Sequence, residues 1–172
     1  PEGGWAIYPG GPADLSASVK AYFALKIVGV PFDDPAMVKA RRVILDAGGA
    51  QGCNSFSRFY LALLGQIEYE ECPSVPPELV LIPSWLGFSL SAMSAWTRPI
   101  LIPLSIMSVH RPVRRLPAGQ GIAELFREDL PRQAGGTREF WSWTNFFLGV
   151  DRLLKWGHRH LPASWRRPAI RA

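Results

Sequence analysis

Apolar side chains recur near the start of the chain at the spacing of an α-helix. Within residues 15–28 they form one face, with two more on its flanks: Leu15, Val19, Phe23 and Ile27, then Tyr22 and Leu25. Positions three and four residues apart share a helix face, so this spacing favours an amphipathic helix. Asp14 precedes the segment as an N-cap, and Gly29 ends it.

A second helix is predicted over residues 35–47. Asp34 and Pro35 are typical of a helix start, and Gly48 and Gly49 stop the segment. The residues expected to face inward are Met37, Val38, Ala40, Ile44 and Leu45.

A third helix begins after a cap at Asn54 or Ser55, runs to Leu64 and is closed by Gly65. Its sequence is apolar on most sides. A helix of this kind is usually buried, so a central position is expected.

The longest apolar stretch is Leu79–Val109, which carries one charge, Arg98. A bilayer-spanning helix needs about 20 apolar residues, and a central arginine costs roughly 2.5–3.5 kcal/mol. Serines and helix breakers also interrupt the stretch, the latter being Pro83, Gly87, Pro99 and Pro103. The pattern therefore favours short helices, buried as core or lining an apolar cavity, over residues 77–81, 89–97 and 99–109.

Further helices are predicted in the rest of the chain, between loops at residues 66–77, 111–121 and 127–136. A short one is expected at 122–126, a longer one from Thr137 through Leu154, and a last one from Pro162 or Ser164. Helices of about 10–15 residues joined by Gly/Pro turns predict an all-α fold, either a bundle or a toroid of helix pairs. We expect residues 1–172 to form a single incomplete domain, truncated at both ends, because the chain starts without methionine and ends within an apparent helix.

The net charge of +5 is uneven and lies largely in two segments, Arg111–Arg115 and Lys155–Arg171. The second segment interleaves Trp156 and Trp165 with basic residues, a composition that suits a membrane interface at least as well as a phosphate backbone. No motif beyond charge supports nucleic-acid binding, so no nucleic-acid partner is expected.

The chain offers little metal chemistry. Cys53 and Cys72 do not form a Cys-x-x-Cys pair. Two lone thiols in a chain of this size are typical of a protein in a reducing compartment. His110, His158 and His160 show no ligand spacing with them, so no metal site is expected.

Several uncommon strings occur in order over nearly the whole chain. They are PEGGWAIYPGGPADLSASVKAYFALKIVG, SFSRFYLALLGQ, VPPELVLIP and SAWTRPILIPLSIM. Together they make the chain similar to the N-terminal half of bacterial squalene–hopene cyclases, which are class II triterpene cyclases. The GGW near the start resembles the end of this family's glutamine–tryptophan repeat.

The resemblance implies part of an α/α toroid (an α6–α6 barrel) around an apolar cavity. It also implies an isomerase of hopanoid biosynthesis that cyclises squalene to hopene or hopanol without a cofactor. The family's catalytic acid lies in an Asp-x-Asp-Asp motif, which this chain lacks; Asp33-Asp34 has only two acids and reads as a helix start. The expectation is a piece of cavity wall without the acid, inactive by itself.

Carried over by resemblance, five residues contact substrate. Trp96 and Phe56 match aromatic residues of the cavity wall, and Tyr60 matches an aromatic position close to Phe56. Met93 and Leu101 fall at constrictions of the entrance, although some relatives have phenylalanine where this chain has Met93.

The partners implied by the resemblance are squalene or a similar polyene, the remainder of the polypeptide, and a membrane. The protein is expected to be a monotopic protein on the cytoplasmic side of the cytoplasmic membrane, which it contacts through the basic–aromatic segment 155–171. A homodimer is compatible with this arrangement. Two alternatives stay open. One is another toroid enzyme, such as a protein prenyltransferase subunit, which needs zinc ligands; the other is a helical lipid-binding or membrane-surface scaffold without catalysis.

Overall fold

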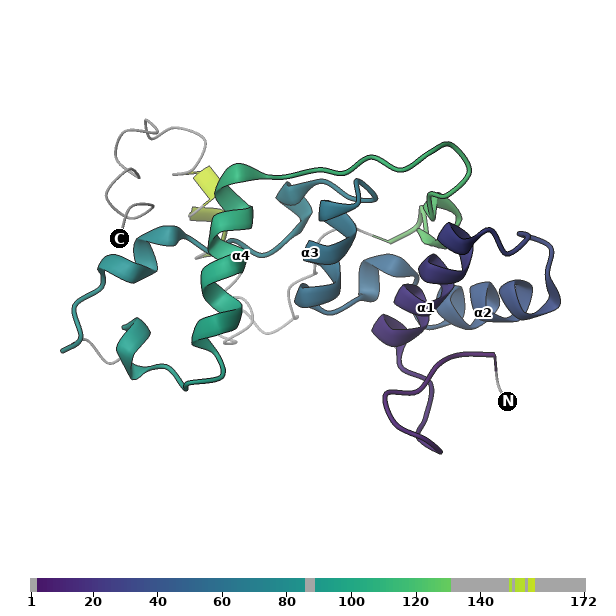
Figure 1. Ribbon diagram of the computed structural model, residues 1–172, viewed down its shortest axis with the longest axis horizontal. Helices are drawn as coiled ribbons and strands as arrows, with labels where there is room; N and C mark the ends of the chain where they lie inside the picture. Colours follow the sequence, from purple (N-terminus) through teal and green to yellow (C-terminus); the bar gives the residue numbers. More distant parts are fainter. Residues whose placement is uncertain (1–2, 86–88, 131–148, 150, 154, 157–172) are drawn as a thin grey trace. The chain divides into compact units, whose positions relative to one another are not determined.

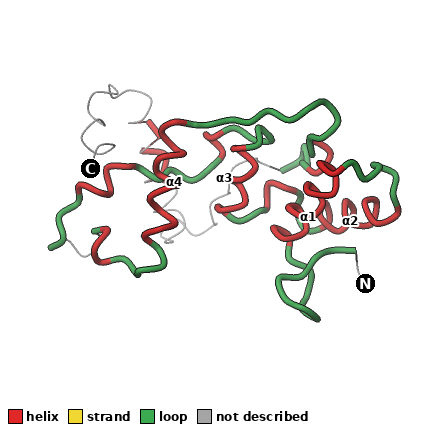
Figure 2. The backbone as a smooth tube through the Cα atoms, in the orientation of Figure 1, coloured by secondary structure: helices red, strands yellow, loops and turns green. Residues whose placement is uncertain are grey.

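The computed structural model describes residues 3–85, 89–130, 149, 151–153 and 155–156, and the described part is helical (Figure 2). Its one β-type feature among these residues is an isolated antiparallel bridge between Ala6 and Ala13. The helix expected from Thr137 is described only at 149, 151–153 and 155–156, which are helical. The expected last helix lies outside the described residues, as does most of segment 155–171.

The chain divides into two compact units. The first comprises Pro1–Cys72 and Val113–Gly135, and the second comprises Pro73–Pro112 and Gly136–Ala172. Because the first unit is built from two separated stretches, contacts between them must hold it together. The single-domain expectation stays a prediction.

Helix α1 (Leu15–Val28) begins and ends where its caps predicted (Figure 1). The Asp14 carboxylate accepts a hydrogen bond from the Ala17 amide at 2.7 Å, which satisfies one of the amides left open at a helix start. Gly29 adopts the left-handed conformation, with φ 96°, which a residue with a Cβ adopts only at a cost. Both cap predictions are confirmed.

Replacing Asp14 with alanine is expected to lower the free energy of unfolding by about 1 kcal/mol, the usual cost of losing a capping side chain. Urea titration of the chain measures it. Asp33→Ala is the matched control, because it removes the same charge from an exposed residue that does not cap a helix. Equal losses in the two variants would show that the cap itself contributes nothing.

The buried face of α1 differs from the expected one. Tyr22 is fully buried beside Val19 and Phe23, whereas Leu15 and Ile27 are only half-buried. Tyrosine can be buried this deeply when its hydroxyl has a hydrogen-bond partner. Here the partner is Glu124, in the second stretch of the first unit. Placing Tyr22 on the flank of the helix was therefore wrong.

Helix α2 (Pro35–Asp46) packs against α1. The Asp34 carboxylate accepts from the Ala36 amide at 2.8 Å, so Asp34 is the N-cap that its sequence context predicted. The residues of α2 that are buried are Met37, Ala40 and Ile44. Val38 is exposed, so its inward placement was wrong. It follows the buried Met37 by one residue, which turns its side chain about 100° around the helix axis, away from the buried face.

Helix α3 (Ser55–Leu63) follows the short 3₁₀ turn η1 (Ala50–Gly52). Asn54 is its N-cap, and its side chain accepts from the Ser57 amide at 2.9 Å. The buried residues of α3 are Ser57, Arg58, Phe59, Leu61 and Ala62. Two further 3₁₀ turns complete the first unit, η2 (Tyr69–Glu71) and η5 (Ala123–Leu125).

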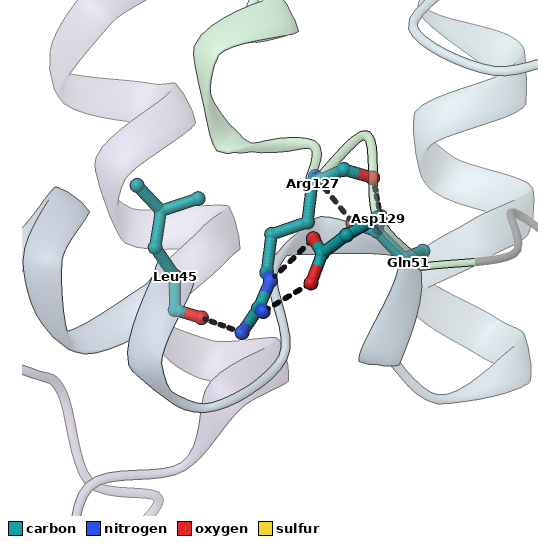
Figure 3. Close-up of polar contacts among 4 residues, drawn as sticks. All are labelled: Leu45, Gln51, Arg127 and Asp129. Carbon is teal, nitrogen blue, oxygen red and sulfur yellow. Dashed lines mark hydrogen bonds and ion pairs between the residues drawn. The ribbon is translucent and has the colours of Figure 1, made fainter.

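A network around Arg127 ties the second stretch of this unit to the first (Figure 3). The buried Gln51 amide donates to the Arg127 carbonyl at 2.6 Å, and its oxygen accepts from the Arg127 amide at 3.1 Å. The guanidinium donates to the Leu45 carbonyl at 3.3 Å, near the end of α2, and to both carboxylate oxygens of Asp129. The bonds of Arg127 to Gln51 and to Leu45 join residues more than 75 positions apart in the sequence.

A second link joins η5 to α1. The Tyr22 hydroxyl donates to the Glu124 carboxylate at 2.9 Å, and the Lys26 ammonium pairs with the same oxygen. Burial and the hydrogen bond to Glu124 raise the pKa of Tyr22 to about 12, despite an opposing effect of Arg41. Tyr22 is therefore neutral at physiological pH and acts as a donor.

The raised pKa of Tyr22 predicts a loss of stability in alkali. Because the folded-state pKa of about 12 exceeds the usual value of 10.0, this contribution is complete below pH 10 and is lost as the pH rises toward 12. We expect the free energy of unfolding to fall over that range, and less steeply in Tyr22→Phe. Urea titrations across the range test it, and parallel slopes for the two proteins would contradict it.

The second unit contains η3 (Pro77–Leu81), η4 (Leu90–Ala92) and α4 (Arg98–His110), and α4 packs against η3. The helix expected at 77–81 is present as a 3₁₀ turn, and α4 matches the helix expected at 99–109 to within one residue at each end. No helix among the described residues is long and apolar enough to cross a bilayer.

The helix expected over 89–97 is wrong, since only Leu90–Ala92 forms one 3₁₀ turn. Hydroxyl groups bond locally there instead. Ser89 and Ser91 lie 2.9 Å apart through their Oγ atoms, and the Ser94 Oγ contacts the Thr97 hydroxyl at 2.7 Å. Such bonds give the chain an alternative to the helical hydrogen-bond ladder.

Candidate functional site

Helix α3 presents two aromatic rings on its outer face. Phe56 and Tyr60 are one turn apart and therefore lie on the same side of the helix. Phe56 is 57% exposed and Tyr60 is 38% exposed, whereas the opposite face is buried. The structure thus brings these two sequence-predicted residues together, and the expectation that α3 is buried on most sides was wrong for this face.

The Tyr60 ring packs against a residue of α1. Phe23, which is fully buried, meets it edge-on, with ring centroids 6.2 Å apart and an interplanar angle of 78°. This is one of the two geometries that aromatic pairs prefer. The outer side of Tyr60 stays open while its inner side is fixed.

An apolar groove of about 180 Å³ lies between α4 and η3 in the second unit. The apolar residues that line it include Leu79, Val80, Leu90, Leu101, Ile102 and Ile106. Ser105 also reaches the groove, but its hydroxyl donates to the Ile102 carbonyl at 2.7 Å and offers no unsatisfied hydrogen. His110 is the other polar residue of the lining, and none of the lining residues is acidic. The groove is therefore suited to a hydrocarbon.

Leu101 is the predicted site residue that lines this groove. Trp96 lies in the turn before α4 and is 79% exposed, and Met93 is half-buried. Sequence reasoning missed Ile102 and Ile106 as groove residues. Their spacing of four along α4 was the signal available. The substrate-contacting roles of Trp96, Phe56, Tyr60, Met93 and Leu101 stay predictions.

The described residues supply binding surface more readily than reactive groups. Burial raises the pKa of the Cys53 thiol to about 11, so it is protonated at neutral pH and is a poor nucleophile. Cys72 is also a buried thiol. No group of three or more His, Cys, Asp or Glu side chains that could hold a metal ion occurs among the described residues.

Comparison with known proteins identifies the family of this chain. The family model for the squalene-hopene cyclase N-terminal domain matches residues 1–172. The chain belongs to the squalene–hopene cyclase family. The resemblance inferred from the sequence strings is therefore confirmed, and so is the all-α fold class of the α/α-toroid type.

The relatives of this chain include squalene–hopene cyclases and a dammaradiene synthase. A probable squalene–hopene cyclase of Sinorhizobium fredii is 41% identical over 171 residues, which cover 98% of this chain and 26% of that protein. The squalene–hopene cyclase of Alicyclobacillus acidocaldarius is 36% identical over 153 residues, covering 89% of this chain and 24% of the relative. A dammaradiene synthase of Dryopteris crassirhizoma is 33% identical over 154 residues, covering 89% and 22%.

The cyclase domain thus spans about a quarter of the length of the bacterial relatives. The Asp33-Asp34 pair within it is accounted for locally, since Asp34 caps α2.

Proposed function

We propose that this domain supplies part of the substrate-cavity wall of a triterpene cyclase that converts squalene to hopene or hopanol in hopanoid biosynthesis. The match of the N-terminal cyclase domain to residues 1–172 carries this proposal. The acid that starts the cascade is supplied elsewhere in the complete polypeptide, because the chain has no Asp-x-Asp-Asp sequence. The relatives do not favour a prenyltransferase or a non-catalytic scaffold.

The physical chemistry of a polyene supports this role. Squalene has no polar group, so its binding energy must come from buried apolar area, at about 25 cal/mol per Å². Cations that form along the chain need stabilisation without a nucleophile, which the negative faces of aromatic rings supply. The groove along α4 offers the first property, and the exposed rings of Phe56, Tyr60 and Trp96 offer the second.

In this proposal Trp96, Phe56 and Tyr60 contact the substrate as aromatic wall. Met93 and Leu101 narrow its entrance. The position of Leu101 in the apolar groove supports its part. The reaction proposed here uses no cofactor.

The test is conversion of squalene by the complete polypeptide, with products separated by gas chromatography and identified by mass spectrometry. Pentacyclic hopene or hopanol is the expected product. A folded, monodisperse protein that leaves squalene and shorter polyenes unchanged contradicts the proposal. Heat-inactivated protein is the control for uncatalysed cyclisation.

The same proposal places the protein on the cytoplasmic face of the cytoplasmic membrane as a monotopic protein, where a hydrocarbon substrate is dissolved. Segment 155–171 makes this contact, and of it only Lys155 and Trp156 are described, Trp156 as an exposed residue. Flotation with vesicles of anionic and neutral lipid tests it. Replacing the basic residues of the segment by glutamine should weaken flotation with anionic vesicles, and equal flotation would contradict the contact.

A further inference from the structure

Phe23 has no direct access to the surface on which a substrate would lie. It sits on α1 and is fully buried, and one of its contacts is the edge-on meeting with the Tyr60 ring. Tyr60 in turn is the less exposed member of the aromatic pair on α3. A buried ring thus fixes the orientation of a partly exposed one.

Orientation matters for an aromatic residue that stabilises a cation. The attraction comes from the quadrupole of the ring and is strongest over its face, so a ring turned by a large angle presents its positive edge instead. The α3 backbone positions the Cβ of Tyr60, but rotation about the bond to the ring is broad for this side chain. An edge-on neighbour at 6.2 Å restricts that rotation.

We infer that Phe23 is a positioning residue that holds the Tyr60 ring in the orientation needed by the polyene-derived cation. This inference rests on the proposed function and adds to it a residue outside the cavity wall. Phe56, one turn away, is 57% exposed, and among the described residues the ring pair is that of Phe23 with Tyr60, so Tyr60 is the ring on which Phe23 acts.

The experiment uses the complete polypeptide and the variant Phe23→Leu, which keeps an apolar side chain and removes the ring. We expect kcat/KM for squalene to fall about two- to tenfold, the factor that corresponds to losing one aromatic pair, and partly cyclised products to increase. Val19→Ala is the control. It shortens another fully buried residue of α1, and we expect a lower melting temperature with an unchanged product distribution.

A double substitution separates positioning from simple packing. If Phe23 acts through Tyr60, then Phe23→Leu should leave the product distribution of a Tyr60→Leu enzyme unchanged, whereas independent effects would multiply. Should Phe23→Leu fail to fold, Phe23→Met removes the ring with a more adaptable side chain.

The outcomes are distinct. Conversion of squalene by the wild type, together with an unchanged Phe23→Leu product distribution, overturns this inference alone, as do multiplicative effects or an equal change in Val19→Ala. Absence of squalene conversion by the wild type overturns the proposed function and this inference with it.

Discussion

Replacing Glu124 with alanine is expected to lower the free energy of unfolding by about 3 kcal/mol at neutral pH. The side chains of Lys26 and Glu124 are only 13% and 22% exposed, so removing the carboxylate leaves an ammonium group largely buried without its counter-charge. Breaking a buried pair from one side costs about 3–5 kcal/mol, and the residual exposure argues for the lower end. The Tyr22 hydroxyl loses its acceptor at the same time.

Urea titration of the chain measures this loss, and Glu128→Ala is the matched control because it removes an exposed carboxylate from the same segment. Comparable losses for the two variants would show that the link to α1 does not stabilise the first unit. The pH dependence gives an independent check. Burial by itself raises the pKa of Glu124, but hydrogen bonds from Lys26, its own backbone and Tyr22 hold it below the usual value.

A lowered folded-state pKa means that the ionised Glu124 stabilises the protein above the unfolded pKa and loses this effect as the pH falls through the folded pKa. The stability difference between the wild type and Glu124→Gln should therefore shrink in acid. A difference that stays constant down to acid pH would contradict the ion pair.

The proposed function predicts that Trp96→Ala in the complete polypeptide lowers squalene turnover about tenfold or releases partly cyclised products. One aromatic face over a desolvated cation is worth about 1–2 kcal/mol, which corresponds to that factor. Because Trp96 is 79% exposed in the described structure, its removal should change stability by no more than about 0.5 kcal/mol. The effect on catalysis should thus be separable from folding.

Trp85→Ala is the control for Trp96, since Trp85 lies in the same unit and is 80% exposed. Turnover and product analysis should distinguish the two variants while their melting temperatures agree. An unchanged rate and product profile for Trp96→Ala would show that Trp96 does not line the proposed cavity. Equal losses in both variants would instead indicate a general need for exposed tryptophan in this unit.

Local signals predicted the helix boundaries well. Asp14 and Asp34 cap the helices that the sequence assigned to them, and Asn54 is one of the two caps predicted for the third helix. Capping is a short-range interaction between a side chain and amides two or three residues away, so local sequence predicts it. The same local reasoning was wrong for residues 89–97. There the competing hydroxyl bonds are equally local, and apolar spacing alone does not weigh them against a helix.

The candidate site was predicted less completely. Residue types and resemblance selected Phe56 and Tyr60, and helical spacing put both on one face of α3. The contact of Tyr60 with Phe23 joins two helices, so no pattern within either helix predicts it. Ile102 and Ile106 were missed although their spacing of four places them on one face of α4. That this face lines a groove depends on the opposite wall, which comes from η3.

The sequence by itself determined the all-α class, the helix caps and the family, because these depend on nearby residues and on ordered strings of them. Tertiary structure alone decided that Tyr22 is buried. Its hydroxyl is satisfied by Glu124, 102 residues later in the chain, and burial of a polar group is favourable only with such a partner. It also decided which apolar residues of α3 stay exposed, since a helix apolar on most sides does not specify which face meets the core.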